Sequence, residues 1–533
     1  MKINHCFMNS WAETVHCWAN LEPIRLDDNW WAAAAAILFV GAALTFLTAG
    51  IVLWRYRRTV RRSVLGTRGS AASDQRAGPS GPPAPAGAST AGGFAPSMAI
   101  EARRKSRALF LRSLACSFTL SSAVTGFFLF ANVALGLAKP DLRGAVDVAI
   151  YWVFFSILFL PLALLSLPLD QFRLWFTYVY LGVVMLLASL LAGAVVGGGA
   201  LTLLFLNWAL GRHGMRVTVP VLLPWCVVWC TCVPALFAFQ RAAECSGLSR
   251  PTSSLLVFWP SFFLAGWLTW RWAGARIVAA IVDMHERKRI SEFELQLFAW
   301  LVILCALIAL VPAGTSPATM LLVAVGAPLA FLAAHRLLVR RPSVGGGPSL
   351  LVLRVFRTDR NAEKLLESVA HWWRFIGPAH LIAGPDLAHV YVAPLALLRF
   401  MTGRFQAHAI AHGASATQVV AALDGRTDPD GRYRINSLVC AHDAWQPVVR
   451  ELVMRADAIL LDLRSMTPGS KGVLWEINLI VESGRADAVV ALVDAHDRSY
   501  PFRTVAWTRK GRPGAAEVFD LLLQARYPAP ASP

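Results

Sequence analysis

Long stretches without a charged side chain dominate the chain up to about residue 340. The longest of them reach the roughly 20 residues that a helix needs to cross a bilayer. Backbone groups inside lipid must be hydrogen-bonded within their own segment, so each stretch predicts a transmembrane helix. Nine spans are predicted, at residues 30–54, 113–137, 148–168, 172–190, 193–210, 217–239, 252–272, 293–312 and 317–336.

Basic residues between the spans predict the orientation of the protein. Arg and Lys collect in the cytoplasmic loops of membrane proteins. Nine spans place every basic cluster on one side, with the N-terminal segment 1–29 outside and the C-terminal region in the cytoplasm. We therefore expect a multi-pass protein of the plasma membrane, of the bacterial inner-membrane type, whose first partner is the lipid bilayer. The clusters lie at 55–62, 103–107, 287–289 and 336–341.

Two segments beside the spans carry other signals. Residues 66–98 are largely Gly, Pro, Ala and Ser, so they cannot bury enough apolar surface to fold. They predict a flexible part of a basic cytoplasmic linker that runs from 55 to 112 and leads into a membrane region at 113–340. Residues 273–292 pair an apolar first half with a charged second half. They are interpreted either as a helix on the membrane surface or as a solvated extension of the preceding span.

The pattern changes at Pro348, after three glycines at 345–347 that predict a hinge. Strands that alternate with helices predict a parallel sheet with right-handed crossovers. The expected fold is an α-helical membrane region followed by a cytoplasmic α/β domain of the flavodoxin-like class at 348–533. Length and apolar content predict strands at 350–356, 380–382, 458–463 and 488–493, and helical spacing predicts helices at 359–375, 445–456 and 472–482.

Polar side chains follow the predicted strands at their carboxyl ends, where ligands of such sheets bind. Guanidinium groups bind phosphate in a forked geometry, so this edge predicts a site for a nucleotide or a sugar phosphate. An internal network of salt bridges at the strand ends is the alternative that stays open. The candidate ligand-binding residues are Arg354, Phe356, Arg357, Asp386, Asp462, Arg464 and, on the helix that follows, Trp475.

The order of elements from 445 to 494 resembles a known family. The helix WQPVVRELVMRADA, the strand ILLDLRS, the loop MTPGSK, the helix GVLWEINLIVESG and the strand DAVVALVD look like the C-terminal half of a Toll/interleukin-1 receptor domain. The placement of a Glu after a Gly-containing loop is also similar to that in nucleoside deoxyribosyltransferases. The resemblance implies that Ser465 matches the strand-end Ser, Ser470 the loop Ser, and Glu476 the Glu with which enzymatic members cleave the N-glycosidic bond of NAD. The stretch 387–440 is longer than the family pattern allows.

This resemblance implies a membrane-anchored signalling or defence protein that binds a nucleotide, with NAD as a candidate substrate and no resident cofactor. A carboxylate at Glu476 suits the oxocarbenium-like transition state of glycosidic cleavage, while Trp475, Phe356 or Trp445 would stack on the base. A non-catalytic sensor or scaffold that self-associates as a homo-oligomer stays open. A transporter or channel with a regulatory domain is disfavoured, because no Asp, Glu or Lys lies in the middle of a predicted span.

Composition argues against two further classes. The net charge of +18 is explained by the loops beside the spans, so no nucleic-acid partner is expected. Histidines and cysteines show no ligand spacing, so no metal site is expected. The run Asp428-Pro429-Asp430-Gly431 lacks the acidic residue that closes a calcium loop, and it predicts a turn.

Overall fold

The computed structural model describes only part of the chain, and three predicted spans, 172–190, 193–210 and 217–239, lie wholly outside that part. Within it, one helix, Ser97–Phe127, is long and apolar enough to cross a membrane, against the nine that were predicted. The number of spans and the location therefore stay predictions. The described residues are 51–60, 94–134, 270–298, 326–354, 369–383, 394–403, 415–440, 444–464, 470–494, 500–507 and 514–526, with single positions at 148, 149, 152, 153, 155, 156, 159, 160, 163, 166, 264, 268, 301, 410 and 466.

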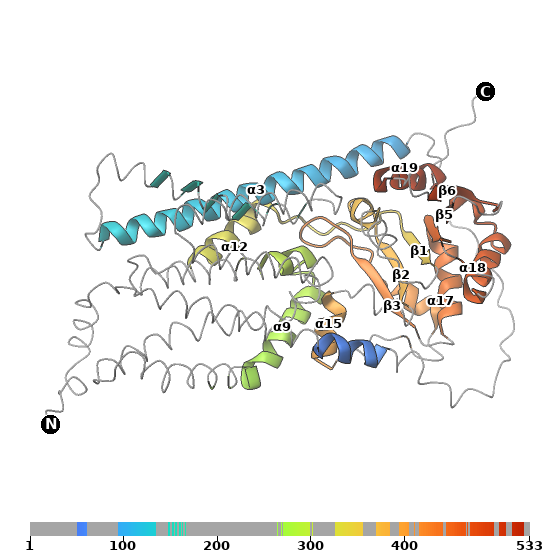
Figure 1. Ribbon diagram of the computed structural model, residues 1–533, viewed down its shortest axis with the longest axis horizontal. Coiled ribbons are helices and arrows are strands. Elements are labelled where there is room, and N and C mark those ends of the chain that lie inside the picture. The colour runs from blue at the N-terminus through green and yellow to red at the C-terminus, as the bar shows by residue number, and fades with distance from the viewer. Residues whose placement is uncertain are drawn as a thin grey trace.

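The long helix α3, Phe94–Ala134, runs from the α/β region along the molecule (Figure 1). It begins inside the segment 55–112, so the last part of the predicted linker is helical. No Gly or Pro interrupts residues 97–125, which are rich in the good helix formers Ala, Leu and Arg. One buried stripe of the helix packs against α12, Ala327–Leu338, and α19, Ala515–Arg526. This stripe consists of Ala102, Leu109, Cys116, Leu120 and Val124.

The segment predicted at 273–292 forms a π-helical turn, Trp270–Gly274, followed by α9, Ala275–Glu286. Both interpretations predicted a helix here, and the helix does not decide between them. The apolar face of α9 is buried within the protein, where Val278 and Val282 pack on Leu398 of α15, Pro394–Met401. A segment between two predicted spans is therefore in direct contact with the C-terminal region.

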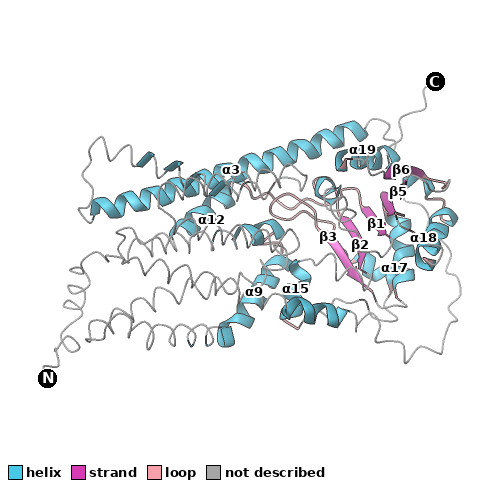
Figure 2. Ribbon diagram, in the orientation of Figure 1, coloured by secondary structure: helices cyan, strands magenta, loops and turns pink. Residues whose placement is uncertain are grey.

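Six parallel strands form one sheet in the order β3-β2-β1-β4-β5-β6 (Figure 2), which confirms the predicted parallel α/β region. A flavodoxin-like sheet has the order 2-1-3-4-5. The observed sheet contains that arrangement with β3 added beside β2, and its complete order is that of doubly wound dinucleotide-binding sheets, which corrects the expected class. The strands are β1 Leu350–Arg354, β2 Ala379–Ala383, β3 Ile435–Val439, β4 Ala458–Asp462, β5 Val489–Asp494 and β6 Arg503–Trp507.

Helices cover both faces of the sheet. Successive residues of a strand point to opposite faces, so each central strand contacts helices on both sides. Leu351 and Leu353 of β1 face the cluster that holds α16, Ala416–Ala421, α17, Trp445–Arg455, and α18, Lys471–Glu482. On the other side, Leu350 and Val352 face the helical segment 369–373 and α19. Both faces of the central strands are thus apolar, which explains the continuous apolar runs in the sequence.

The second of these cores continues into segments before residue 348. One buried cluster contains Trp373 and Phe519 together with Leu109 of α3, with Phe331 of α12 and with Phe293. The region after residue 348 therefore shares its core with the segments before it.

The glycines at 345–347 do not form the predicted hinge. Gly345 forms an antiparallel bridge with Arg426, and a Cβ at Gly347 would overlap the carbonyl oxygen of Ile376. Glycine is needed at 347 for close approach of two backbones, and the segment is held on both sides.

Gly377→Ala should destabilise the protein strongly, by about 3 kcal/mol or more. A Cβ at Gly377 would overlap the carbonyl oxygen of Pro348, and a backbone atom cannot turn aside as a flexible side chain can. Gly425→Ala is the matched control, since nothing lies within 4 Å of a Cβ at that position. Thermal unfolding of the full-length protein in detergent measures the difference, and equal midpoints for the two variants would contradict the expectation.

Candidate functional site

The candidate site lies where the strand order reverses at the centre of the sheet. β1 and β4 are neighbours there, while the chain continues outward to β2 on one side and to β5 on the other. Arg354 and Asp462 are register partners at the carboxyl ends of these two strands. Open parallel sheets bind their ligands in the crevice at this point. The structure thus brings the backbones of two predicted site residues together at the expected place.

Asp462 and Arg464 are engaged with each other. Arg464 donates from Nε to Oδ1 and from Nη2 to Oδ2 of Asp462, both at 2.7 Å, and its backbone N–H donates to Oδ1 at 3.3 Å. Both side chains are buried. A forked, charge-assisted pair of this kind is strong. For these two residues the structure therefore shows the internal salt bridge, which was the alternative to a phosphate site. A phosphate would have to compete with the Asp462 carboxylate for the guanidinium group.

Glu476 lies on the face of α18 that packs on the sheet. Ser470 occupies the position before the first turn of this helix, and the buried positions of the helix follow at helical spacing. Glu476 therefore stands at a position where the pattern would otherwise place an apolar side chain. The buried residues are Val473, Glu476, Leu479 and Ile480.

The Glu476 carboxyl group is almost completely desolvated. The residue is 4% exposed, and its Oε2 atom has no hydrogen-bond partner among the described residues. Burial raises the pKa of the Glu476 carboxyl from its usual 4.5 to about 8. The carboxyl group is therefore mostly protonated at pH 7. A buried acid with a strongly perturbed pKa is typical of functional sites.

Two half-buried tryptophans lie beside the start of α18. The rings of Trp445, the first residue of α17, and Trp475 are 5.0 Å apart between centroids and meet edge to face at 78°. A Cβ at Gly472 would lie 3.8 Å from the Trp445 ring, so this ring also covers the first turn of α18. Two of the three predicted base-stacking residues thus form one aromatic pair, and one of them, Trp475, directly precedes Glu476 in the chain.

The other predicted site residues cannot be placed relative to this group, because they lie outside the part of the chain that the structure describes. Ser465, Phe356, Arg357 and Asp386 lie outside the described residues, as does the side chain of Arg354. Within the described part of the chain, no three His, Cys, Asp or Glu side chains are grouped to hold a metal ion.

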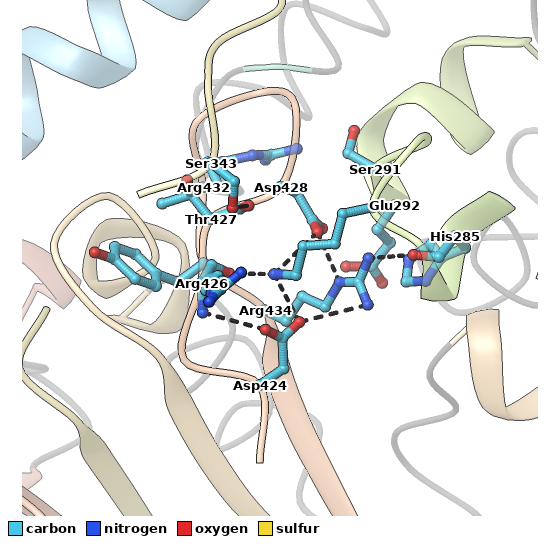
Figure 3. Close-up of polar contacts among 12 residues, drawn as sticks. His285, Ser291, Glu292, Ser343, Asp424, Arg426, Thr427, Asp428, Arg432 and Arg434 are labelled. Atoms are coloured by element: carbon cyan, nitrogen blue, oxygen red, sulfur yellow. Dashed lines mark hydrogen bonds and ion pairs between the residues drawn. The ribbon is translucent and has the colours of Figure 1, made fainter. Parts of the chain in front are cut away.

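A second polar cluster was missed by sequence reasoning. The predicted turn at 428–431 is present, with Gly431 at φ 79° and its N–H donating to the Asp428 carbonyl oxygen at 2.9 Å. Its carboxylates are nevertheless buried, and Asp428 pairs with Arg434, as Figure 3 shows, and with Lys288 of the 285–292 segment. The only signal in the sequence was the alternation of acidic and basic residues from Asp424 to Arg434.

Comparison of the chain with protein-family models, with curated proteins and with solved structures finds no match. The resemblance to Toll/interleukin-1 receptor domains and to nucleoside deoxyribosyltransferases therefore rests on the sequence pattern from 445 to 494 alone.

Proposed function

We propose that the chain is a membrane-anchored protein, with its C-terminal region in the cytoplasm, that binds a nucleotide at the carboxyl edge of the sheet and cleaves its N-glycosidic bond. The observation that supports this function most directly is the desolvated carboxyl group of Glu476. With a pKa of about 8, the protonated form of Glu476 dominates near neutral pH, while a minor fraction is ionised. A group whose pKa lies close to the working pH can both give and accept a proton, as general acid–base catalysis requires.

The protonated carboxyl group has a defined task in this reaction. As the bond between the base nitrogen and C1′ of the ribose breaks, Glu476 gives its proton to the departing base and the sugar gains oxocarbenium character. A water molecule then adds at C1′, and its proton returns to Glu476. This sequence suits purine nucleosides and nucleotides, whose base leaves more readily when protonated. Nicotinamide leaves NAD as a neutral base, so NAD cleavage would use the carboxylate form.

Binding would draw on the side chains around Glu476. Trp445 and Trp475 offer aromatic surface for a base, since such rings stack on every base type. A phosphate that displaces Asp462 from Arg464 would gain a guanidinium fork. The binding step therefore includes the opening of one internal salt bridge.

Base release tests the proposal directly. Full-length protein in lipid nanodiscs is incubated with NAD, adenosine, inosine and AMP, and the free base is separated by chromatography. We expect release by the wild type and a rate at least about 100-fold lower in Glu476→Gln, because the amide cannot transfer the proton. Glu482→Gln is the matched control, since Glu482 is an exposed residue of the same helix. Purine release without nicotinamide release would assign the acid role, and release of neither by the wild type would contradict the proposal.

A non-catalytic sensor or scaffold is the second candidate. The near-complete burial of Glu476 and the closed Asp462–Arg464 pair favour it, because neither group is open to solvent. In this role the domain would self-associate or bind a nucleotide without cleaving it, and Glu476→Gln would leave the cellular phenotype unchanged.

A further inference from the structure

Besides the apolar packing of α9 on α15, a partly buried group of charges joins the end of α9 to the C-terminal region, and we call this group the junction cluster. It consists of Lys288, Asp424, Asp428 and Arg434, of which Figure 3 labels the last three. Lys288 follows α9, whereas the other three residues belong to the segment that leads into β3. The cluster therefore joins a segment between two predicted spans to the edge of the sheet.

Each cation of the junction cluster contacts both carboxylates. Lys288 Nζ lies 2.7 Å from Asp424 Oδ2 and 3.7 Å from Asp428 Oδ1, and it also donates to the carbonyl oxygen of Arg426. Arg434 lies 2.7 Å from Asp428 Oδ1 and 3.5 Å from Asp424 Oδ2, and it also donates to the carbonyl oxygen of His285 in α9. Each carboxylate therefore has two cationic partners, one from each side of the contact.

Burial makes these contacts interdependent. The Asp428 side chain is 0% exposed. Desolvation raises the pKa of the Asp428 carboxyl to about 7, and Arg434 opposes that rise more than any other group. Removing either cation would leave a buried carboxylate without its compensation, which is far less favourable than the intact pair.

The backbone at Lys288 supports a role beyond packing. Lys288 is the only non-glycine residue with a positive φ, 56°, in the part of the chain that the structure describes. The conformation ends α9 and turns the lysine toward the cluster, although it is unfavourable for a residue with a Cβ. Such backbone persists where the surroundings over-determine it, and it is common at switch regions.

Flanking ion pairs extend the same contact on both sides. Arg374, in the helical turn before β2, lies 3.2 Å from Glu292, and its backbone carbonyl accepts from Tyr433 N at 2.7 Å. Arg399 of α15 lies 3.0 Å from Glu286 at the end of α9. The segment 285–292 is thus tied to three separate parts of the α/β region, at β3, before β2 and at α15.

We propose that the junction cluster is a coupling device that makes α9 and the β3 edge of the sheet move as one body, so that a displacement of the membrane helices reaches the α/β domain. Arg434 stands directly before Ile435, the first residue of β3, so any shift at the cluster acts on a strand end. That this shift would regulate the carboxyl-edge site rests on the proposed function, whereas the coupling itself does not.

Hydrogen–deuterium exchange of the full-length protein in nanodiscs, without nucleotide, tests the coupling. Lys288→Gln should speed exchange by about tenfold or more in residues 424–440 as well as in 275–294, because local opening exposes a cooperative unit together. Arg434→Gln should speed exchange in 275–286, on the far side of the contact. Exchange in β4 and β5 should stay unchanged in both variants, which shows that the sheet remains folded.

Asp283→Asn is the matched control, because it breaks an exposed pair with Arg287 in α9 and leaves the junction cluster intact. It should not change exchange in 424–440. Loosening confined to the mutated side of the contact would overturn the coupling. Different free energies of local opening for 275–286 and 427–434 in the wild-type protein would also overturn the coupling. This second measurement uses the wild type alone, so it does not depend on whether a variant folds. Base release is measured separately, so a failure of the proposed function would leave this result standing.

Discussion

Glu476→Gln should be more heat-stable than the wild type at pH 9, and the two should be close to equal at pH 5. The pKa of the Glu476 carboxyl is about 8 in the folded protein and 4.5 when unperturbed, so the folded state binds this proton more tightly. The stabilisation is complete below about pH 4.5 and is lost as the pH rises toward 8, at about 1.4 kcal/mol per pH unit. Glutamine cannot ionise and should not show this loss.

Thermal unfolding at pH 5, 7 and 9 follows this difference through intrinsic fluorescence. Glu482→Gln again serves as the control and should follow the wild type at each pH. Parallel pH profiles for the wild type and Glu476→Gln would show that the buried carboxyl group does not titrate as expected. A variant that is more stable at pH 9 but releases no base would indicate that Glu476 is kept for its chemistry at a cost in stability.

Trp373→Ala should destabilise the protein by about 3–5 kcal/mol, the range for deleting a large buried aromatic side chain. Trp373 is 0% exposed and meets Phe519 of α19 edge to face at 6.1 Å. Its Nε1–H donates to the carbonyl oxygen of Pro348 at 3.0 Å, at the start of β1. The variant therefore loses packing on α19 and one hydrogen bond to the segment that enters the sheet.

Two comparisons separate these contributions. Trp373→Phe keeps much of the packing and should lose about 1 kcal/mol for the missing hydrogen bond, plus the smaller ring volume. Met454→Ala, at a residue that is 44% exposed, should change stability by no more than about 0.5 kcal/mol. The same thermal unfolding assay applies. A Trp373→Ala midpoint as high as that of Met454→Ala would show that Trp373 does not anchor the core.

The central elements of the α/β region were predictable because they are apolar on both faces. The strands found at β1, β2, β4 and β5 lie within one or two residues of the predicted ones. The edge strands β3 and β6 were missed, since INSLV and RTVAW mix polar with apolar residues and carry apolar runs of only two or three residues. Partly solvated edges give a weaker pattern than buried strands.

The candidate site was predictable only where it depends on the succession of elements along the chain. Glu476, Trp475 and Ser470 follow from the succession of strand, loop and helix. The raised pKa of Glu476 depends on the surrounding packing, and the edge-to-face meeting of Trp445 with Trp475 joins two helices. The contact between Arg434 and His285 spans 149 residues of sequence, which no local pattern encodes.

α3 is longer than a crossing of the bilayer requires. A helix of 41 residues extends about 60 Å, twice the roughly 30 Å thickness of a hydrocarbon core. If the predicted span 113–137 is the part within the bilayer, the other half rises into the cytoplasm alongside α19, and Arg103 pairs there with Asp520 at 2.9 Å. The sheet then lies directly at the cytoplasmic ends of the predicted spans, because Phe293 and Phe331 share a buried core with Trp373 and Phe519.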